Sequence, residues 1–255
     1  MSNLSYFSIK TIILFEIKDY FKEFQFNVIA PLINTLLFVF IFSTIDRYYN
    51  FNSLESSYIN FLIPGMIMSI IIQTSFNHLS EVIINMKQIG SFNDFLISPI
   101  SRIEIFISFI LSSIFVCVIV AFLNFIVLSF FVEYESINFI IFIYYLILSI
   151  TIFSSIGAII GFLSFSWDIQ SSVANFFILP VSFFSGTFFS IDLVDKKYQF
   201  IFYYNPFYYL VNGFRSAFIN SYEISFYNNI YICIIVIITL TISIYIFQKG
   251  YKVIN

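Results

Sequence analysis

Six stretches of mostly apolar residues alternate with shorter polar stretches along the whole chain. A helix needs about 20 mostly apolar residues to cross the hydrocarbon core of a bilayer. We therefore predict an all-α membrane protein, a single transmembrane domain over residues 1–255. Its six transmembrane helices would cover residues 26–45, 58–80, 104–131, 138–165, 170–190 and 228–248.

The first 25 residues show a different pattern, in which apolar and charged residues recur at spacings of three and four. This periodicity predicts an amphipathic helix over 1–25 that lies in the membrane interface. The alternative is a polar extension of the first transmembrane helix. The predicted apolar face carries Tyr6, Ile9, Ile13, Ile17, Tyr20 and Phe24, and the predicted polar face carries Thr11, Glu16, Lys18, Asp19, Lys22 and Glu23.

Composition supports this class, since 60% of the 255 residues are hydrophobic and 10% are charged. Soluble domains carry about 25% charged residues, so this chain lacks the side chains that a water-exposed surface needs. The net charge of −3 offers no basic patch for nucleic acid. Cys117 and Cys233 lie in apolar runs, without the spacing of a metal site or a disulfide framework.

Lysine and arginine residues indicate the orientation, because they are enriched in cytoplasmic loops. With six transmembrane helices, both termini lie on one side of the membrane. That side would hold seven of these residues, against four on the other side. The count predicts cytoplasmic termini in a multi-pass membrane protein.

No motif for catalysis, cofactor binding or metal binding stands out. The chain lacks the glycine-rich phosphate-binding sequence of nucleotide-hydrolysing proteins. His78 is the one histidine, and Glu81 follows it on the same helical face, where the two side chains could hydrogen-bond. We favour a structural or interfacial role for this pair over a proton relay.

Several small or polar residues lie inside the predicted transmembrane helices. Gly157 and Gly161 form a small-xxx-small pair at which two helices could approach closely. Four amide side chains could either line a pathway or hydrogen-bond to a neighbouring helix, and packing is the preferred interpretation for Asn34, Gln73, Asn124 and Asn175.

Between the second and third transmembrane helices the chain is polar but still compatible with a helix. Gly90 would end the preceding helix, and Ser91 or Asn93 could cap a short transverse helix. Phe92 and Phe95 would then be exposed at the cytoplasmic surface. They would fit a socket on a partner protein or dip back into lipid, and both readings stay open.

The segment 193–226, between the fifth and sixth transmembrane helices, combines aromatic residues with charge. Lys196, Lys197 and Arg215 argue against a single spanning helix there, and Asn205-Pro206 marks a break. The segment is also too aromatic for a free loop. We predict re-entrant helices, which are tolerated where protein or a water-filled cavity buries them.

Three passages, in this order and spacing, resemble the ABC-2 type permease family, the membrane subunits of a class of ATP-driven exporters. They run from Phe61 to Met68, from Gly90 to Ile105, and from Ser185 to Arg215. The six-helix count also fits, so the resemblance covers essentially the whole chain. In two places the chain departs from the family pattern, which often has proline near Leu193-Val-Asp195 and usually has glutamate at the position of Asn93.

The resemblance implies an exporter in which two copies of this chain, a homodimer among membrane lipids, form the path along the second and fifth helices. ATP and Mg would be bound by a separate ABC ATPase subunit, so this chain would hold no cofactor. The coupling segment 85–102 would contact the ATPase through Gly90, Ser91, Phe92, Asn93, Asp94, Phe95 and Leu96. The outer re-entrant segment 193–226 would include Asn205, Pro206, Tyr209, Gly213 and Arg215.

The resemblance further implies a location in the bacterial inner membrane. It also implies a lipid, a glycan or a hydrophobic drug-like molecule as the passenger. Two other classes stay open as alternatives. A membrane-embedded lipid-modifying enzyme would need a cluster of His, Asp or Arg near an interface, of which the sequence offers fragments. A proton-driven secondary transporter would need carboxylates within the membrane, and these are scarce.

Overall fold

The structure is a computed structural model, and it describes residues 2–49, 58–92, 94, 100–132, 134, 136–219 and 225–249. Helices dominate this part of the chain, and it contains no β-strand. In chain order the elements are α1 (Ser2–Lys22), η1 (Gln25–Ile29), α2 (Ala30–Tyr49), α3 (Tyr58–Ile89), α5 (Arg102–Leu128), η2 (Ser129–Phe131), α6 (Phe139–Leu163), α7 (Trp167–Val173), η3 (Ala174–Ile178), α8 (Leu179–Phe183), η4 (Ile191–Leu193), α9 (Phe200–Tyr203), α10 (Pro206–Arg215) and α11 (Phe226–Lys249).

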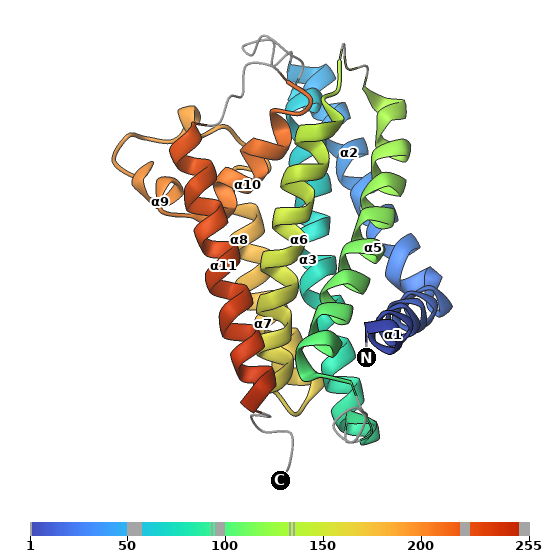
Figure 1. The fold of residues 1–255 in the computed structure, drawn as a ribbon. Coiled ribbons are helices and arrows are strands. Elements are labelled where there is room, and N and C mark those ends of the chain that lie inside the picture. The colour runs from blue at the N-terminus through green and yellow to red at the C-terminus, as the bar shows by residue number, and fades with distance from the viewer. Residues whose placement is uncertain are drawn as a thin grey trace.

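Five helices in the described part are long and apolar enough to cross a membrane, and they form one bundle (Figure 1). They cover Gln25–Ile45, Tyr58–Ile89, Arg102–Phe131, Phe139–Leu163 and Phe226–Lys249. Five of the six predicted transmembrane helices are therefore confirmed as candidate spans. The second is longer than predicted, because α3 continues past residue 80 to Ile89.

The predicted helix at 170–190 has different bounds in the structure. α7, η3 and α8 form one continuous helical stretch that begins at Trp167 and ends at Phe183. At about 1.5 Å per residue it spans about 26 Å, which is slightly less than the hydrocarbon core. The count of six transmembrane helices is thus not confirmed. The apolar run continues past Phe183 as a turn through Gly186, whose φ is 73°, and hydrophobicity alone does not reveal where the helix ends.

Two glycines allow α6 to pack closely on α3 in the centre of the bundle. A Cβ atom at Gly157 would lie 2.3 Å from the backbone oxygen of Phe76. A Cβ atom at Gly161 would lie 3.0 Å from Cβ of Ile83. The close approach that the small-xxx-small pair predicts is therefore confirmed, and α3 is the partner helix.

α2 and α11 lie at the periphery of this bundle. Few of their residues are buried, whereas most of α3 is buried. Outward-facing side chains such as Leu37 and Phe40 on α2 and Ile237 on α11 are large and apolar. A surface of this kind suits contact with lipid or with another membrane helix.

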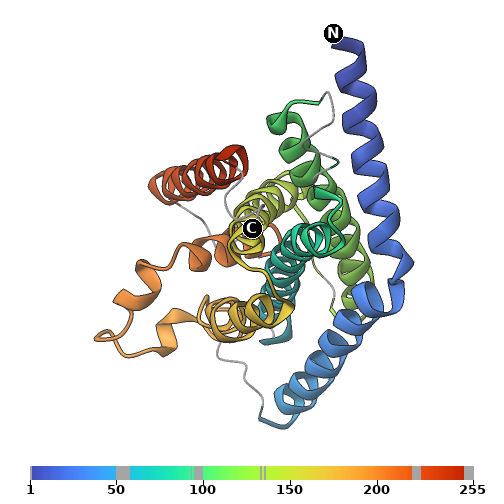
Figure 2. The same ribbon diagram turned by 90° about the horizontal axis from the view of Figure 1, so that it is seen from below.

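α1 lies across the bundle and packs against α5, as the view along the bundle in Figure 2 shows. A helix at the N-terminus is confirmed. Ile9, Ile13, Ile17 and Tyr20 of its predicted apolar face are half-buried, but Glu16 of the predicted polar face is buried as well. Ile12 and Glu16 are buried, whereas Tyr6 of the predicted apolar face is 65% exposed. The face is set by contacts with α5 and α3, and this contact face includes one carboxylate, Glu16.

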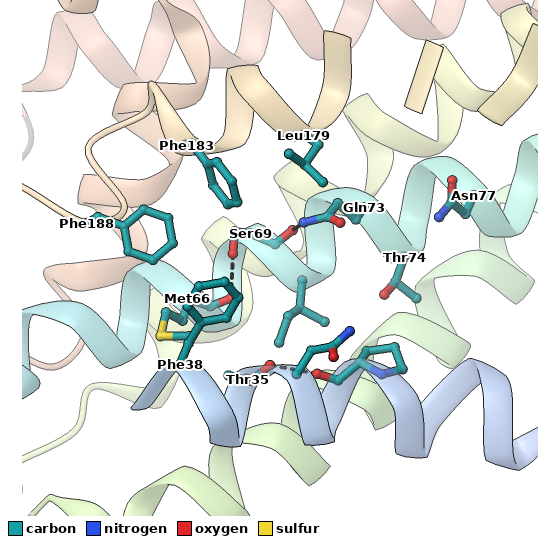
Figure 3. A pocket seen from close by; sticks show the side chains of 13 residues that line it. Thr35, Phe38, Met66, Ser69, Gln73, Thr74, Asn77, Leu179, Phe183 and Phe188 are labelled. Atoms are coloured by element: carbon teal, nitrogen blue, oxygen red, sulfur yellow. Dashed lines mark hydrogen bonds between the residues drawn. The ribbon is translucent and has the colours of Figure 1, made fainter. Parts of the chain in front are cut away.

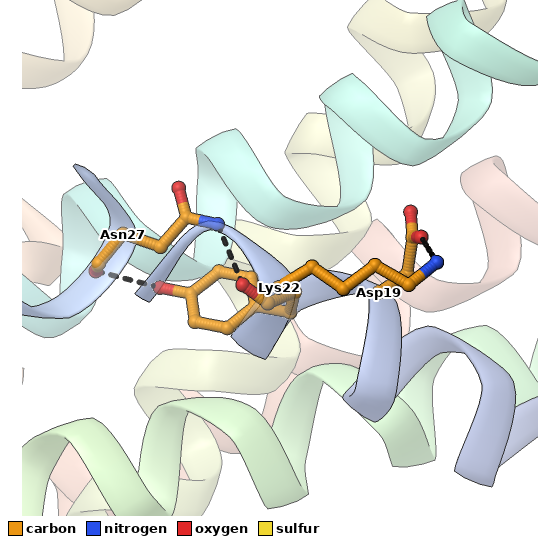
Figure 4. A network of polar contacts seen from close by, with 4 residues as sticks. Asp19, Lys22 and Asn27 are labelled. Carbon is orange, nitrogen blue, oxygen red and sulfur yellow. Dashed lines mark hydrogen bonds and ion pairs between the residues drawn. The ribbon is translucent and has the colours of Figure 1, made fainter. Parts of the chain in front are cut away.

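The chain turns from α1 into α2 at the π-helix η1. The Tyr20 hydroxyl donates to the backbone oxygen of Asn27 at 3.0 Å, and Asn27 Nδ2 donates to the backbone oxygen of Tyr20 at 2.9 Å (Figure 4). This reciprocal pair fixes the corner, and it orients the ring of Tyr20.

Candidate functional site

A pocket of about 350 Å³ opens between α2, α3 and α8 (Figure 3). Its volume falls within the range of about 300–1,000 Å³ that is usual for small-molecule sites. α2 contributes Pro31, Asn34, Thr35 and Phe38, α3 contributes Met66, Ser69, Ile70, Gln73, Thr74 and Asn77, and the third wall consists of Leu179, Phe183 and Phe188.

The α3 wall of this pocket is polar. Ser69, Gln73 and Asn77 follow one another at intervals of four, which places them on one face of the helix. Ser69 Oγ donates to the backbone oxygen of Met66 at 2.9 Å, and Gln73 Nε2 donates to that of Ser69 at 3.3 Å. These donors bond within α3, so the oxygen atoms of the same side chains can accept hydrogen bonds from a ligand.

The opposite wall is aromatic. The ring centroid of Phe188 lies 5.0 Å from that of Phe183 and 6.1 Å from that of Phe38. The Tyr58 hydroxyl donates to the backbone oxygen of Phe188 at 2.6 Å, which anchors this wall to the start of α3. With one polar and one aromatic wall, the pocket suits an amphipathic ligand.

The four amide residues singled out in the sequence separate into two groups. Asn34 and Gln73 line the pocket, as the pathway interpretation requires. Asn124 is buried in α5 and donates to the backbone oxygen of Val120 at 2.8 Å, which is a packing role. Asn175 is exposed and lies outside the pocket lining.

Sequence reasoning missed most of the pocket, including Thr35, Ser69 and Phe188. One signal was present, since polar residues recur every four positions from Ser69 to Asn77 within an apolar helix. Nothing in the sequence pairs that face with Thr35 on α2 or with Phe188, which is far away along the chain.

The predicted coupling segment is described in part. α3 ends at Ile89, and Gly90 follows with φ of 81°, so the predicted break at this glycine is confirmed. Phe92 is 3% exposed, and its ring lies 6.1 Å from that of Phe162 and 5.8 Å from that of Phe247.

The predicted exposure of Phe92 is therefore wrong, because the chain folds back and the ring fills space between the ends of α6 and α11. Asp94 is exposed and Ser91 is half-buried. Asn93, Phe95 and Leu96 lie outside the described residues. Contact of this segment with an ATPase stays a prediction.

Two basic side chains near the two ends of this segment bind the ends of neighbouring helices. Lys87 Nζ donates to the backbone oxygens of Gly161 at 2.8 Å and Ser164 at 3.1 Å, at the C-terminal end of α6. Arg102 Nη1 donates to the backbone oxygen of Gln248, near the end of α11. Cations in these positions satisfy helix-terminal carbonyls and favour the negative end of the helix dipole. Lys87 thereby joins the end of α3 to that of α6, and Arg102 joins the start of α5 to the end of α11.

The start of α5 is also fixed locally. Ser101 Oγ accepts from the backbone amide of Glu104, and the Glu104 carboxylate accepts from the backbone amide of Ser101. This reciprocal capping satisfies two amides that a helix start otherwise leaves open. The helix predicted from residue 104 therefore begins slightly earlier, at Arg102.

The segment after α8 contains two short helices, α9 and α10, with Asn205 between them. Asn205 Oδ1 accepts from the backbone amide of Phe207 at 3.0 Å, and Pro206 occupies the first position of α10. The Tyr209 hydroxyl donates to the backbone oxygen of Tyr203 at 2.9 Å, which folds α10 back towards α9. That these helices are re-entrant in a membrane stays a prediction.

Arg215, at the end of α10, is buried among backbone groups. Its Nε donates to the backbone oxygen of Phe61 at 3.1 Å, and its Nη2 donates to that of Gly186 at 2.9 Å. Its guanidinium carbon lies 3.7 Å from the ring centroid of Phe61. Arg215 therefore joins α10 to the start of α3 and to the turn after α8. Gly213, which is also buried, lies on the same short helix.

Glycine is required at this junction for a steric reason. A Cβ atom at Gly65 would lie 2.6 Å from the backbone oxygen of Thr187 and 3.0 Å from Arg215 Nη2. Two of the three passages singled out in the sequence thus meet here, the first through Phe61 and Gly65 and the third through Gly186 and Arg215. The outer segment is anchored to the same helix that forms the polar wall of the pocket.

These features define a multi-pass, all-helical membrane protein that has a pocket between its helices and no metal-binding cluster among the described residues. The model of the ABC-2 type transporter family matches residues 8–219. The chain belongs to this family of transport permeases. It is similar to the inner membrane transport permease YadH of Escherichia coli K12 and to the protein of the same name from Shigella flexneri, with 23% identity over 219 residues and 86% of each chain covered in both comparisons.

Proposed function

We propose that the chain is the transmembrane subunit of an ATP-driven exporter, and that two copies form the translocation path. The pocket between α2, α3 and α8 is the observation that carries this proposal. The pocket lies on the side of the bundle where most of the surface of α2 is not covered by other helices. In a dimer, the pockets of two copies would face a common path along α2, α3 and α8.

The lining of the pocket favours an amphipathic passenger. The three phenylalanine rings of its aromatic wall offer stacking and apolar contact, and the polar face of α3 offers hydrogen-bond acceptors. A lipid, a glycan with a lipid anchor or a hydrophobic drug-like molecule combines these features. The permease names of the relatives agree with transport and leave the passenger open.

In this proposal the stretch from Trp167 to Phe183 is a sixth membrane crossing. Its apolar residues continue as the turn towards Phe189, and crossings of about 17 residues occur in thin or locally thinned bilayers. With six crossings both termini share one side of the inner membrane, and the lysine and arginine distribution favours the cytoplasm. α9 and α10 would then close the outer side.

A partner ATPase would supply the driving force, and it would bind ATP and Mg. The exposed surface around Gly90 would receive the ATPase, and it includes Ile89, Asp94 and the half-buried Ser91. Ile89 is 72% exposed at the end of α3, so a movement imposed there would act directly on the helix that lines the pocket. The ATPase must bind the two conformations of the permease with different free energies for transport to be driven.

The test is co-purification with a candidate ABC ATPase from the same genome. We expect Ile89→Asp to lower the recovered ATPase at least about tenfold, which corresponds to about 1.4 kcal/mol. Phe130→Asp is the matched control, because Phe130 is 84% exposed at the opposite end of the α5 stretch. Phe92 is unsuitable for this test, since its buried ring supports the fold.

Two results would overturn the proposal. Equal recovery of the ATPase with Ile89→Asp and Phe130→Asp would show that the surface around Gly90 does not bind the ATPase. Transport or lipid turnover by the purified chain alone in liposomes, without any nucleotide, would favour the proton-driven transporter or the lipid-modifying enzyme.

A further inference from the structure

A second cavity, of about 340 Å³, lies between α1, α3 and the start of α7. It is separate from the pocket described above and shares no lining residue with it. Four carboxylates contribute to its lining, from Glu16, Asp19, Glu23 and Glu81. One cation, Lys22, also lines it, and Lys22 pairs with Asp19 at 2.8 Å (Figure 4). The cavity is therefore strongly acidic.

Two buried side chains of this lining lack partners in the described part of the chain. Glu16 and His78 are each 3% exposed. Oε1 of Glu16 and both ring nitrogens of His78 have no hydrogen-bond partner among the described residues. Leaving such groups unpaired costs about 1–3 kcal/mol each, so a ligand in the cavity that donates hydrogen bonds would stabilise them. The predicted hydrogen bond between His78 and Glu81 is absent.

The carboxylates are spread along the cavity. Glu16 and Asp19 also line a neighbouring cavity of about 520 Å³, towards Ile89. Glu23 and Glu81 line only the cavity of about 340 Å³. Among the described residues, no three His, Cys, Asp or Glu side chains are grouped closely enough to hold one metal ion. This spacing fits a cation whose charges are separated by a flexible chain.

Aromatic rings complete the walls. The Tyr20 hydroxyl is held by Asn27, and Trp167 Nε1 donates to Gln88 Oε1 at 2.7 Å, so both rings are fixed. Both residues line the cavity. Ring faces attract ammonium groups, and fixed rings lose little freedom when a cation binds.

We propose that this cavity binds a short aliphatic diamine, protonated at both ends, between α1 and α3. One ammonium group donates to Glu16, and the other interacts with Glu81 and Glu23 beside His78. The methylene chain lies against the rings of Tyr20 and Trp167. Burial and the charge of Asp19 raise the pKa of Glu16 to about 7, and an ammonium partner stabilises the ionised form of this carboxylate.

The test is isothermal titration of the purified full-length protein with putrescine. We expect saturable binding, with butylammonium, which has one charge and the same chain length, binding at least about tenfold more weakly. Glu16→Gln and Glu81→Gln should each weaken putrescine binding about tenfold or more. Asp195→Asn is the control, because Asp195 is exposed in the segment after α8, and its putrescine affinity should stay unchanged.

Thermal unfolding of the unsubstituted protein provides a second readout that needs no variant. Putrescine should raise the melting temperature more than butylammonium does at the same ionic strength. The proposal is overturned by equal effects of the two amines, by absence of saturable putrescine binding, or by equal affinities of Glu16→Gln and Asp195→Asn. Binding of Mg²⁺ at the same site with equal or higher affinity would also overturn the choice of a diamine.

Discussion

Gly157→Ala tests the close packing of α3 and α6, on which the bundle depends. The added methyl carbon would lie 2.3 Å from the backbone oxygen of Phe76, whereas ordinary contacts of Cβ atoms begin at 3.4 Å. The two helices must therefore separate locally by about 1.1 Å, the difference of these distances. The atom that must move belongs to the backbone of α3, so no side-chain rotation relieves the clash.

The magnitude follows from two opposing effects. Overpacking in a close-packed interior costs about 1–3 kcal/mol, and a backbone clash belongs at the upper end. Alanine is the better helix former, which returns about 1 kcal/mol. The net loss of stability is about 2 kcal/mol, and a melting temperature falls by about 2–4 °C per kcal/mol for a chain of this size. We expect a decrease of about 4–8 °C.

The assay is thermal unfolding of the purified protein in one detergent, with Gly161→Ala as the matched variant. At Gly161 the nearest atoms are Cβ of Ile83 at 3.0 Å and the backbone oxygen of Ser80 at 3.1 Å, so a smaller shift of α3 is sufficient than at Gly157. Gly161→Ala should therefore melt within about 3 °C of the unsubstituted protein. A melting temperature of Gly157→Ala equal to or above that of Gly161→Ala would refute the packing of α6 on α3 described above.

Two further substitutions have defined outcomes. Arg215→Lys should destabilise the protein by about 2–3 kcal/mol, because lysine lacks the planar fork that reaches both Phe61 and Gly186, and a melting temperature within about 1 °C of the unsubstituted protein contradicts this role. Glu16 has a folded-state pKa raised from 4.5 to about 7, so the folded state binds more protons and stability falls as pH rises between these values. Melting curves of Glu16→Gln should show a smaller decrease over this pH interval, and an equal decrease contradicts the burial of an ionisable Glu16.

Hydrophobic length predicted the long helices because a membrane-spanning helix must satisfy its own backbone within one apolar segment. The same reasoning failed at α8. There the apolar residues continue beyond Phe183, but the backbone turns at Gly186 to meet Arg215. Arg215, which contacts this turn, lies far along the chain, so hydrophobic length gives no indication of that contact.

Amphipathic periodicity predicted a helix at the N-terminus and most of the residues on its contact face, but not the burial of Glu16. Polarity placed Glu16 outward, whereas packing places it inward against a cavity. Phe92 shows the converse error, because an aromatic residue in a polar connection was expected at the surface and instead fills the core. Both errors arise where tertiary contacts between distant helices decide burial.

Some features of the coupling segment, the outer segment and the pocket could be predicted from the sequence. Gly90 and Asn205-Pro206 mark backbone breaks by residue type alone, and the structure has those breaks. The pocket residues required the fold, because Thr35 and Phe188 carry no sign of their shared position. Polar residues within a transmembrane helix, such as Gln73, were the one indication of it.

The central proposal is alternating access, in which a partner ATPase switches the pocket between openings on the two sides of the membrane. Labelling of a cysteine in the pocket tests it most directly. Cys117 and Cys233 are first replaced by alanine, and Gln73→Cys then places a single thiol in the pocket wall. The complex with the ATPase is reconstituted in liposomes, and a membrane-impermeant maleimide is added from either side. We predict that ATP binding moves the labelling of residue 73 from one side of the membrane to the other. Labelling from the same side at the same rate with and without ATP would contradict the proposal.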